Sequence, residues 1–289
     1  MPLVLTIGTA TFAQNTLKDG TSLLWDKEIA VTADSLRNDS VTVPAYAVPV
    51  YEATASQVSG LLKTVVPGAA FKKQGQVLKA IGVNFASTGA PMDVLAKVAQ
   101  DKKQGLSTLS LAFLTSGTST PVVNPKLEPA VRDLGIQLNK AVVQQQVDEW
   151  KKKLDKADTK TASATKDQDK AQGKLNKAQA QLEKSAKEKS KLQNEHAVLQ
   201  KQIDLDNQKW TLSQSPKDLK RLTKARTKIT KNEAQMAKAM QSEADAQKSL
   251  SKSSSDLPDA QKAKELKAAA QAEVQRTVDS LQRKLENIR

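Results

Sequence analysis

Apolar side chains recur with a two-residue period along residues 41–51, and both alternating faces are largely apolar. Such a period predicts a β-strand. Pro44 and Pro49 have no N–H to donate to a sheet ladder, so we expect this strand to lie at a sheet edge or to carry a bulge. Apolar residues at helical spacing over 56–66, closed by a Pro-Gly pair, then predict one short amphipathic helix.

Two further alternating segments, 92–98 and 109–113, flank the polar residues 101–105, which end in glycine. This arrangement predicts a β-hairpin. Residues 76–85 predict an additional strand. One helix against a small, mostly antiparallel sheet makes an α+β head, and we expect this head to span residues 20–120.

A seven-residue repeat begins at Val147 and continues to Trp210. Its first and fourth positions, called a and d, are mostly apolar, which is typical of a coiled coil. The repeat lapses at residues 213–215, and a second, equally regular repeat holds Leu222 at its first a position. The sequence therefore predicts a long antiparallel α-helical coiled-coil hairpin over residues 147–289. The predicted core residues of this stalk are Trp150, Leu154, Leu192, Leu199, Ile203, Ile229, Met236, Leu281 and Leu285.

An antiparallel hairpin makes a demand on the sequence, because the residues that face each other must follow one register. The two repeats meet this demand: from the tip to Leu250, each apolar layer joins an a residue of one segment to a d residue of the other. The same register places His196 opposite Asn232, and this polar layer would fix the alignment of the helices. It also brings Lys189 near Glu243, where an ion pair is expected.

Two segments interrupt or precede the regular repeats. Residues 121–146 are expected to hold a linker and the start of the long helix, with Asn124 as its N-cap. The serine-rich segment 251–258 predicts a break in the second repeat, after which Asp256 caps a third helix. The same helix face returns beyond this break.

The composition limits what the chain can build. It has 289 residues, of which only 3% are aromatic, and this is little for two globular cores. The net charge of +14 lies almost wholly in residues 126–289. A basic helical surface favours acidic partners such as nucleic acid, anionic lipid or acidic proteins, although solvated lysines produce the same pattern. Cysteine is absent, which excludes disulfides and thiolate metal sites.

Candidate catalytic groups are few. His196 is the single histidine, so we expect it to set the register rather than to act as a base or metal ligand. Residues 115–120 loosely resemble a phosphate-binding loop but lack its terminal Gly-Lys-Ser/Thr, which favours a linker. We therefore expect no enzymatic activity and no catalytic, cofactor-binding or metal-binding residues. Trp150 and Trp210 occupy core positions, which leaves no aromatic platform for bases and argues against nucleic acid.

An apolar stretch from Leu3 to Phe12 leads into small residues at a spacing that suits signal peptidase. We expect residues 1–13 to be a signal peptide, shortened because no basic leader precedes it. A buried first strand is the alternative. No later segment is long and apolar enough for a transmembrane helix, so we expect none after signal cleavage.

The order of these features resembles exported Gram-negative bacterial proteins of uncharacterised function: an export signal, a strand and helix, the hairpin of residues 92–113 and a Lys/Glu/Ala-rich stalk. The resemblance implies a place in the periplasm or cell envelope. The basic helical hairpin is also similar to the tentacles of the Skp family of periplasmic chaperones. In that family, however, strands from both chain ends close the body.

Three non-enzymatic functions are consistent with these features. The first is an envelope spacer or scaffold, which implies a protein partner bound through the head or the stalk. The second is a holdase-like periplasmic chaperone, which implies an oligomer. The third is non-specific binding of a polyanion, either nucleic acid or an anionic surface, through the lysines.

Overall fold

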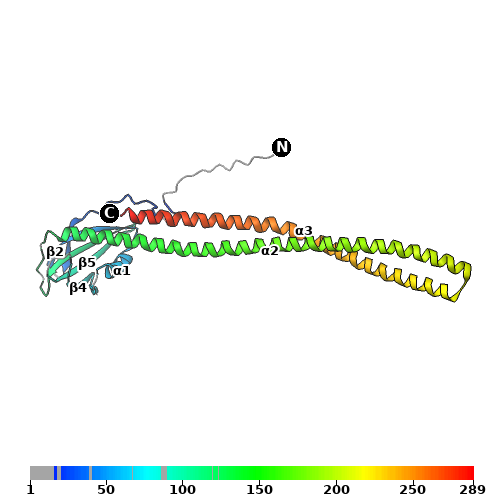
Figure 1. Cartoon of the computed structure of the whole chain (residues 1–289). Helices are drawn as coiled ribbons and strands as arrows, with labels where there is room; N and C mark the ends of the chain where they lie inside the picture. The colour runs from blue at the N-terminus through cyan, green and yellow to red at the C-terminus, as the bar shows by residue number, and fades with distance from the viewer. Residues whose placement is uncertain are drawn as a thin grey trace, which may run out of the picture. The chain divides into compact units, whose positions relative to one another are not determined.

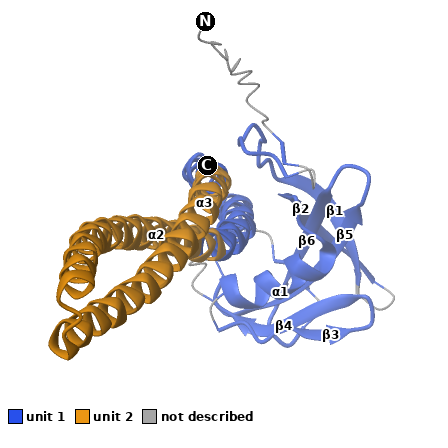
Figure 2. Ribbon diagram, turned by 90° about the vertical axis from the view of Figure 1, so that its right-hand side faces the viewer, with its two compact units in different colours: residues 1–155, 273–289 blue, residues 156–272 orange. Residues whose placement is uncertain are grey.

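The computed structural model describes residues 16–17, 21–38, 41–66, 68–85, 90–118, 120–122 and 124–289. The predicted signal peptide, residues 1–13, lies outside the described residues. The chain forms two compact units (Figure 2). The head unit comprises the residues up to Asp155 together with Glu273–Arg289, and the hairpin unit comprises Lys156–Ala272.

The head unit contains one antiparallel six-stranded sheet and one short helix, α1 (Ala55–Val65) (Figure 1). The sheet order is β1-β2-β6-β5-β4-β3. This architecture confirms the predicted α+β head. The strands are β1 (Thr32–Asn38), β2 (Val41–Tyr51), β3 (Lys72–Gln74), β4 (Val77–Val83), β5 (Met92–Asp101) and β6 (Leu106–Thr115).

Four of the six strands match segments expected from their periodicity. β5 and β6 form the predicted hairpin, and their register runs from Met92 opposite Thr115 to Asp101 opposite Leu106. β2 and β4 also lie where alternation indicates a strand. β1 and β3 are not predicted, because β1 is mainly polar and β3 has three residues, so neither shows an alternating apolar face.

β2 lies inside the sheet, between β1 and β6, which corrects the expectation of an edge strand. The prolines are accommodated because β2 pairs with β1 only over Val41–Ala47 and with β6 only over Tyr46–Tyr51. Pro44 therefore has only β1 beside it, and Pro49 has only β6. At each proline β2 is locally an edge, so the missing N–H breaks no ladder hydrogen bond.

One face of the sheet carries the main core of the head unit. α1 begins with a capping box between Thr54 and Gln57 and buries Val58 and Leu62 against this core. The first turns of α2 (Leu127–Ser213) pack on it as well, and so does Ile288 from the end of the chain. The segment expected to be a linker and helix start thus supplies much of the core. Its most deeply buried residues are Leu127, Val131 and Leu138.

α2 and α3 (Pro216–Glu286) form the predicted helical hairpin (Figure 1). The chain reverses at the expected serine-containing segment, where Gln214 has a φ of +47°. Ser215 caps α3, because its Oγ accepts a hydrogen bond from the backbone N–H of Lys217 at 3.2 Å. At the other end of α2, Asn124 accepts a bond from the Lys126 N–H at 2.9 Å within the turn before the helix. Because α2 begins at Leu127, Asn124 lies three residues before the helix and is not its N-cap.

α3 continues without interruption through residues 251–258, which corrects the predicted break and third helix. Pro258 lies inside this helix. The heptad spacing explains the continuity, since packing along the seam outweighs the low helix propensity of the serines. Of the four residues at the core spacing of three and four there, Ser253 is buried, and the half-buried ones are Leu250, Leu257 and Ala260.

Candidate functional site

The nine predicted core residues of the stalk are shielded from solvent to different degrees. In the hairpin unit, Leu192 and Ile229 are buried, while Leu199, Ile203 and Met236 are half-buried. The remaining predicted core residues belong to the head unit. There Leu281 is fully buried, and the half-buried residues are Trp150, Leu154 and Leu285.

His196 and Asn232, which the predicted register places opposite each other, bond to different partners. Asn232 is buried and donates through Nδ2 to the carbonyl oxygen of Leu192 at 3.2 Å. The His196 ring lies instead at the edge of the seam, with Nε2 3.4 Å from a carboxylate oxygen of Glu233. The Asn232 amide bonds to the backbone of the opposite helix. The imidazole of His196 therefore does not share this bond and lies at the side of the seam. Their role in register remains a prediction.

The ion pair expected between Lys189 and Glu243 is confirmed. Lys189 Nζ lies 2.8 Å from Glu243 Oε2, and both side chains are about one-third exposed. One layer away, Ser185 Oγ lies 3.0 Å from Ser242 Oγ, and Gln181 donates to the same hydroxyl at 3.3 Å. Polar groups therefore interrupt the apolar seam over this stretch of the hairpin.

An open groove runs along one side of these polar layers, with a volume of about 690 Å³. Both helices contribute to it, and its walls come mainly from positions c, d and g of the two heptads. Four lysines and two aspartates give it a basic lining. The charged residues of the groove are Lys174, Lys177, Lys238, Lys252, Asp245 and Asp256.

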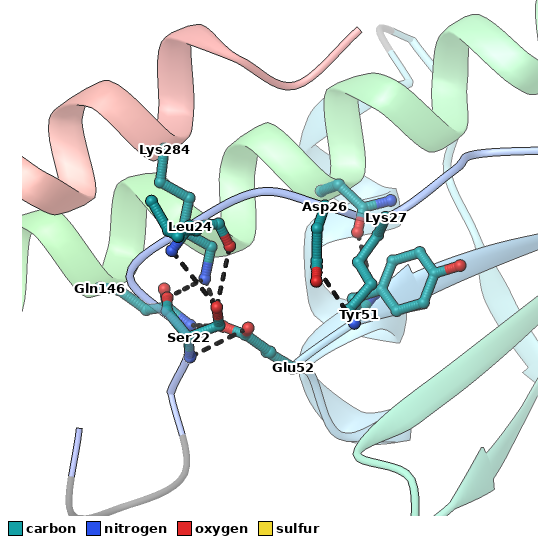
Figure 3. Close-up of polar contacts among 9 residues, drawn as sticks. Ser22, Leu24, Asp26, Lys27, Tyr51, Glu52, Gln146 and Lys284 are labelled. Carbon is teal, nitrogen blue, oxygen red and sulfur yellow. Dashed lines mark hydrogen bonds and ion pairs between the residues drawn. The ribbon is translucent and has the colours of Figure 1, made fainter. Parts of the chain in front are cut away.

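The head unit contains a buried charge that the sequence does not reveal. Lys284 is 0% exposed, and its Nζ lies 2.6 Å from Glu52 Oε2 and 2.7 Å from the carbonyl oxygen of Ser22 (Figure 3). Gln146 donates to the same Glu52 oxygen at 3.0 Å, and the Ser22 N–H reaches Glu52 Oε1 at 3.3 Å. This network joins α3, α2, the end of β2 and the segment before β1.

Nothing in the heptad pattern distinguishes Lys284 from the solvated lysines of the stalk. It occupies a g position beside Leu285, where lysine is ordinarily exposed. Glu52 has a φ of +55°, a conformation that few residues other than glycine adopt. Like the burial of Lys284, this strained backbone is visible only in the folded structure. The periodicity of the sequence therefore gives no indication of the Lys284–Glu52 pair.

A second contact fastens α2 to β2. A Cβ at Gly135 would lie 2.3 Å from Val48 Cγ2, so the helix approaches the strand more closely than any side chain allows. Asn139, one turn later, accepts the N–H of Tyr51 at 2.9 Å and donates to the Pro49 carbonyl at 2.9 Å. Its side chain replaces a neighbouring strand on the free edge of β2. A glycine inside an otherwise periodic helix is a signal that sequence reasoning missed.

β4 carries a bulge that presents an apolar side chain to solvent. Its register with β5 shifts between Ala80 and Val83, and Ile81, within the shift, is 71% exposed. The nearly buried Asp93 holds this conformation, because its Oδ1 accepts from the Gly82 N–H at 3.1 Å and from Ser116 Oγ at 3.0 Å. Bulges commonly redirect side chains at functional surfaces.

Asp34 of β1 and Ser110 of β6 form a hydrogen bond that lowers the pKa of the carboxyl group. Ser110 donates its hydroxyl to Asp34 Oδ2 at 2.5 Å, and this bond is the main reason why the pKa of Asp34 lies below its ordinary value. The backbone N–H of Ser35 and the charge of Lys97 act in the same direction. The pair lies on the sheet face opposite the main core.

Among the described residues, no group of three or more His, Cys, Asp or Glu side chains is placed to hold a metal ion. None of the described helices combines the length and apolar content of a membrane-spanning segment. Comparison with protein-family models and with curated proteins finds no match to this chain.

Proposed function

We propose that this chain is a non-enzymatic interaction protein, a scaffold in which the head binds a protein partner and the helical hairpin serves as a spacer. The observation that carries this proposal is the rooting of both long helices in the core of the head unit. α2 contributes Val131, Leu134 and Leu138 to that core, and the end of the chain contributes Ile288. A helical hairpin whose chain starts and ends in one core suits a scaffold.

The polar contacts of the head unit support the same conclusion. The Lys284–Glu52 pair draws α3 onto the end of β2, and Asn139 does the same for α2. Ser22 adds the segment before β1 to this junction. Four separate parts of the chain are thereby held at one place, and such a junction limits independent movement of the helix roots.

Ile81 marks the surface of the head that we assign to the partner. It is an aliphatic side chain, strongly exposed, on a bulge that a nearly buried carboxylate stabilises. An exposed aliphatic residue on a braced backbone is pre-organised for an apolar contact, since little conformational entropy is lost on binding. The partner is therefore expected to offer an apolar pocket.

An affinity pull-down from a Gram-negative envelope extract tests this assignment. The full chain should capture one dominant partner, which mass spectrometry identifies and titration with purified proteins confirms. Ile81→Lys should lower the affinity for that partner at least tenfold. Val41→Lys is the matched control, because Val41 is also an exposed aliphatic residue of the sheet and lies on β2. Equal binding by both variants would reject the proposed surface.

The proposal includes a place in the periplasm or cell envelope. Its support is the apolar segment from Leu3 to Phe12 and the resemblance to exported Gram-negative proteins. Fractionation of cells that express the chain from its first residue tests it. Recovery of the protein only in the cytoplasmic fraction would contradict this part of the proposal.

A further inference from the structure

The part of the hairpin unit nearest the turn carries an exposed stripe of aliphatic and lysine residues on α2. Its members follow one another at spacings of three or four residues, so they lie along one face of the helix. The three aliphatic members are well exposed: Val198 is 67%, Leu205 is 52% and Leu212 is 88% exposed. Two exposed lysines alternate with them, Lys201 and Lys209.

α3 carries a matching stripe made entirely of lysine. Its five members follow the same spacings of three and four residues and are all exposed. With the two lysines of α2, seven ammonium groups lie on these two stripes. The members of the α3 stripe are Lys217, Lys220, Lys224, Lys228 and Lys231.

The two stripes lie on the same side of the hairpin. Each occupies positions c, f and g of its heptad, and in an antiparallel helix pair the g positions of one helix face those of the other. Gln181 and Ser242 are both g residues, and their hydrogen bond of 3.3 Å shows this arrangement directly. A groove nearer the turn is also lined by c, d and g residues of both helices, among them Lys191 and Lys238. We call the combined surface of the two stripes the lysine–leucine face.

The opposite side of the same helices has a different chemistry. Its threonines bond to their own helix, since Thr223 and Thr230 donate to the carbonyl oxygens of Leu219 and Arg226. Charges of both signs are few on this side. Its exposed members over the same stretch are Gln200, Asp204, Asn207, Thr211, Leu219, Thr223, Arg226 and Thr230. The positive charge is therefore concentrated on one side.

Acidic residues do not neutralise the lysine–leucine face. Asp218 lies at the turn and accepts a hydrogen bond from Ser213 Oγ at 2.7 Å, and Arg221 lies 3.7 Å from it. Glu195 is a g residue at the far end of the α2 stripe, where Lys191 Nζ lies 3.9 Å away. Both carboxylates already have partners, so the seven lysines carry a net positive field.

We propose that the lysine–leucine face docks the hairpin onto a bilayer surface that contains anionic phospholipids. Seven lysines near an anionic leaflet give a strong, salt-dependent attraction. Val198, Leu205 and Leu212 then enter the boundary between headgroups and acyl chains, as the apolar face of an interfacial helix does. This combination of aliphatic and ammonium groups fits a lipid surface better than nucleic acid, because the face has no aromatic side chain on which bases could stack and its arginine, Arg221, already lies 3.7 Å from Asp218.

This inference goes beyond the proposed scaffold function, because it concerns the hairpin unit and not the partner surface around Ile81. A chain that fails to bind lipid but still captures its partner through the head would refute only the docking of the hairpin. Loss of partner capture with lipid binding intact would refute only the head surface. The two experiments therefore fail separately.

Co-sedimentation of the full chain with phosphatidylcholine vesicles, with and without phosphatidylglycerol, tests the proposal. Binding should require phosphatidylglycerol and decrease as salt is raised. Replacing Lys220, Lys224 and Lys228 together by Gln should lower the partition coefficient roughly 100-fold, because each lysine near an anionic surface contributes roughly a factor of five. Equal binding to neutral vesicles, or none to anionic ones, would overturn the proposal.

Aliphatic variants separate a lipid surface from other polyanions. The double variant Leu205→Gln, Leu212→Gln should lower vesicle partition about 10-fold, since two buried side chains are lost from the interface. Leu219→Gln is the matched control on the opposite side and should leave it unchanged. Circular dichroism confirms that each variant keeps its helix content. If duplex DNA binds more tightly than vesicles, and the leucine variant leaves both unchanged, the face is a nucleic-acid surface and the lipid proposal is wrong.

Discussion

The head unit and the hairpin unit are held together in different ways. In the head, Val48, Leu109 and Leu138 are completely buried because a sheet and three helices surround them. In the hairpin, only one helix faces another, so even the seam residues Leu192 and Ile229 retain some exposure. Stability in the head is therefore concentrated at a few crowded positions, whereas in the hairpin it is spread over many similar layers.

This difference bears on where each unit can tolerate a functional surface. The hairpin exposes Leu212 and its lysines without disturbing its seam, because c, f and g positions do not contribute to the a/d core. In the head, the exposed side chain of Ile81 lies on a bulge that a carboxylate supports. A change of surface chemistry should thus cost little in the hairpin and more in the head.

The largest expected effect compares a core leucine with a seam leucine. Leu109→Ala should lower the free energy of unfolding of the head by about 4 kcal/mol, because surrounding atoms cannot fill the cavity. Leu192→Ala should cost about 2 kcal/mol, since the seam is open to solvent on both sides. Hydrogen exchange measured by mass spectrometry assigns each loss to its unit. Equal losses would show that the hairpin is packed like a globular core.

A substitution of Lys284 tests how much one buried ion pair contributes to the stability of the head. Lys284→Met preserves much of the volume but leaves the Glu52 carboxylate without its cation, and should destabilise the head by about 3 kcal/mol. Adding Glu52→Gln should restore part of this loss. Urea unfolding followed by tryptophan fluorescence measures both. A loss below about 1 kcal/mol would mean that the pair is dispensable.

Two helical glycines sharpen the contrast between the units. Gly135→Ala should cost about 2 kcal/mol, because the new methyl group would overlap Val48. Gly173 in the hairpin has open space around it, so Gly173→Ala should stabilise its helix by about 0.5 to 1 kcal/mol. Thermal unfolding monitored by circular dichroism compares the two. If both substitutions change the stability in the same direction, the proposed difference between the two units is wrong.

A substitution of Asn232 tests whether this buried polar residue lowers the stability of the hairpin while it fixes the register of the two helices. Its Oδ1 is buried and has no hydrogen-bond partner among the described residues. Asn232→Leu should therefore raise the stability of the hairpin by about 1 kcal/mol while permitting other registers. Cysteine pairs placed across the seam report the register through disulfide formation. If the variant is less stable and keeps one register, the polar layer has no aligning role.

The smallest effect concerns the Ser110–Asp34 bond. The pKa of Asp34 is lowered in the folded head, so its bond stabilises the fold above the unfolded pKa and this contribution is lost as pH falls through the folded pKa. Ser110→Ala should raise the pKa of Asp34 toward its ordinary value and reduce stability at neutral pH by less than about 1 kcal/mol. The deficit should vanish in acid. NMR titration of the Asp34 carboxyl carbon checks the direction.

Sequence reasoning succeeded wherever one period extended over many residues. The β5–β6 hairpin, α1 and the reversal between Ser213 and Pro216 all lie where expected. It was wrong at residues 251–258, because local propensity favoured a break and seam packing favoured a helix. The Lys189–Glu243 pair was predictable because two regular helices bring fixed positions together. The partners of His196 and Asn232 were not predictable, since the orientation of each side chain decides that Asn232 donates to the Leu192 carbonyl and that His196 lies beside Glu233.

Periodicity alone predicts most elements of this protein: four of the six strands, a seven-residue repeat, and a turn that folds the repeat back on itself. How the first turns of α2 and the last turns of α3 pack on the head is visible only in the folded structure. Lys284 and Glu52 are separated by 232 positions, and no local period connects them. Periodicity records which face of an element avoids water, whereas a buried ion pair or a close helix–strand approach depends on which distant surface that face meets.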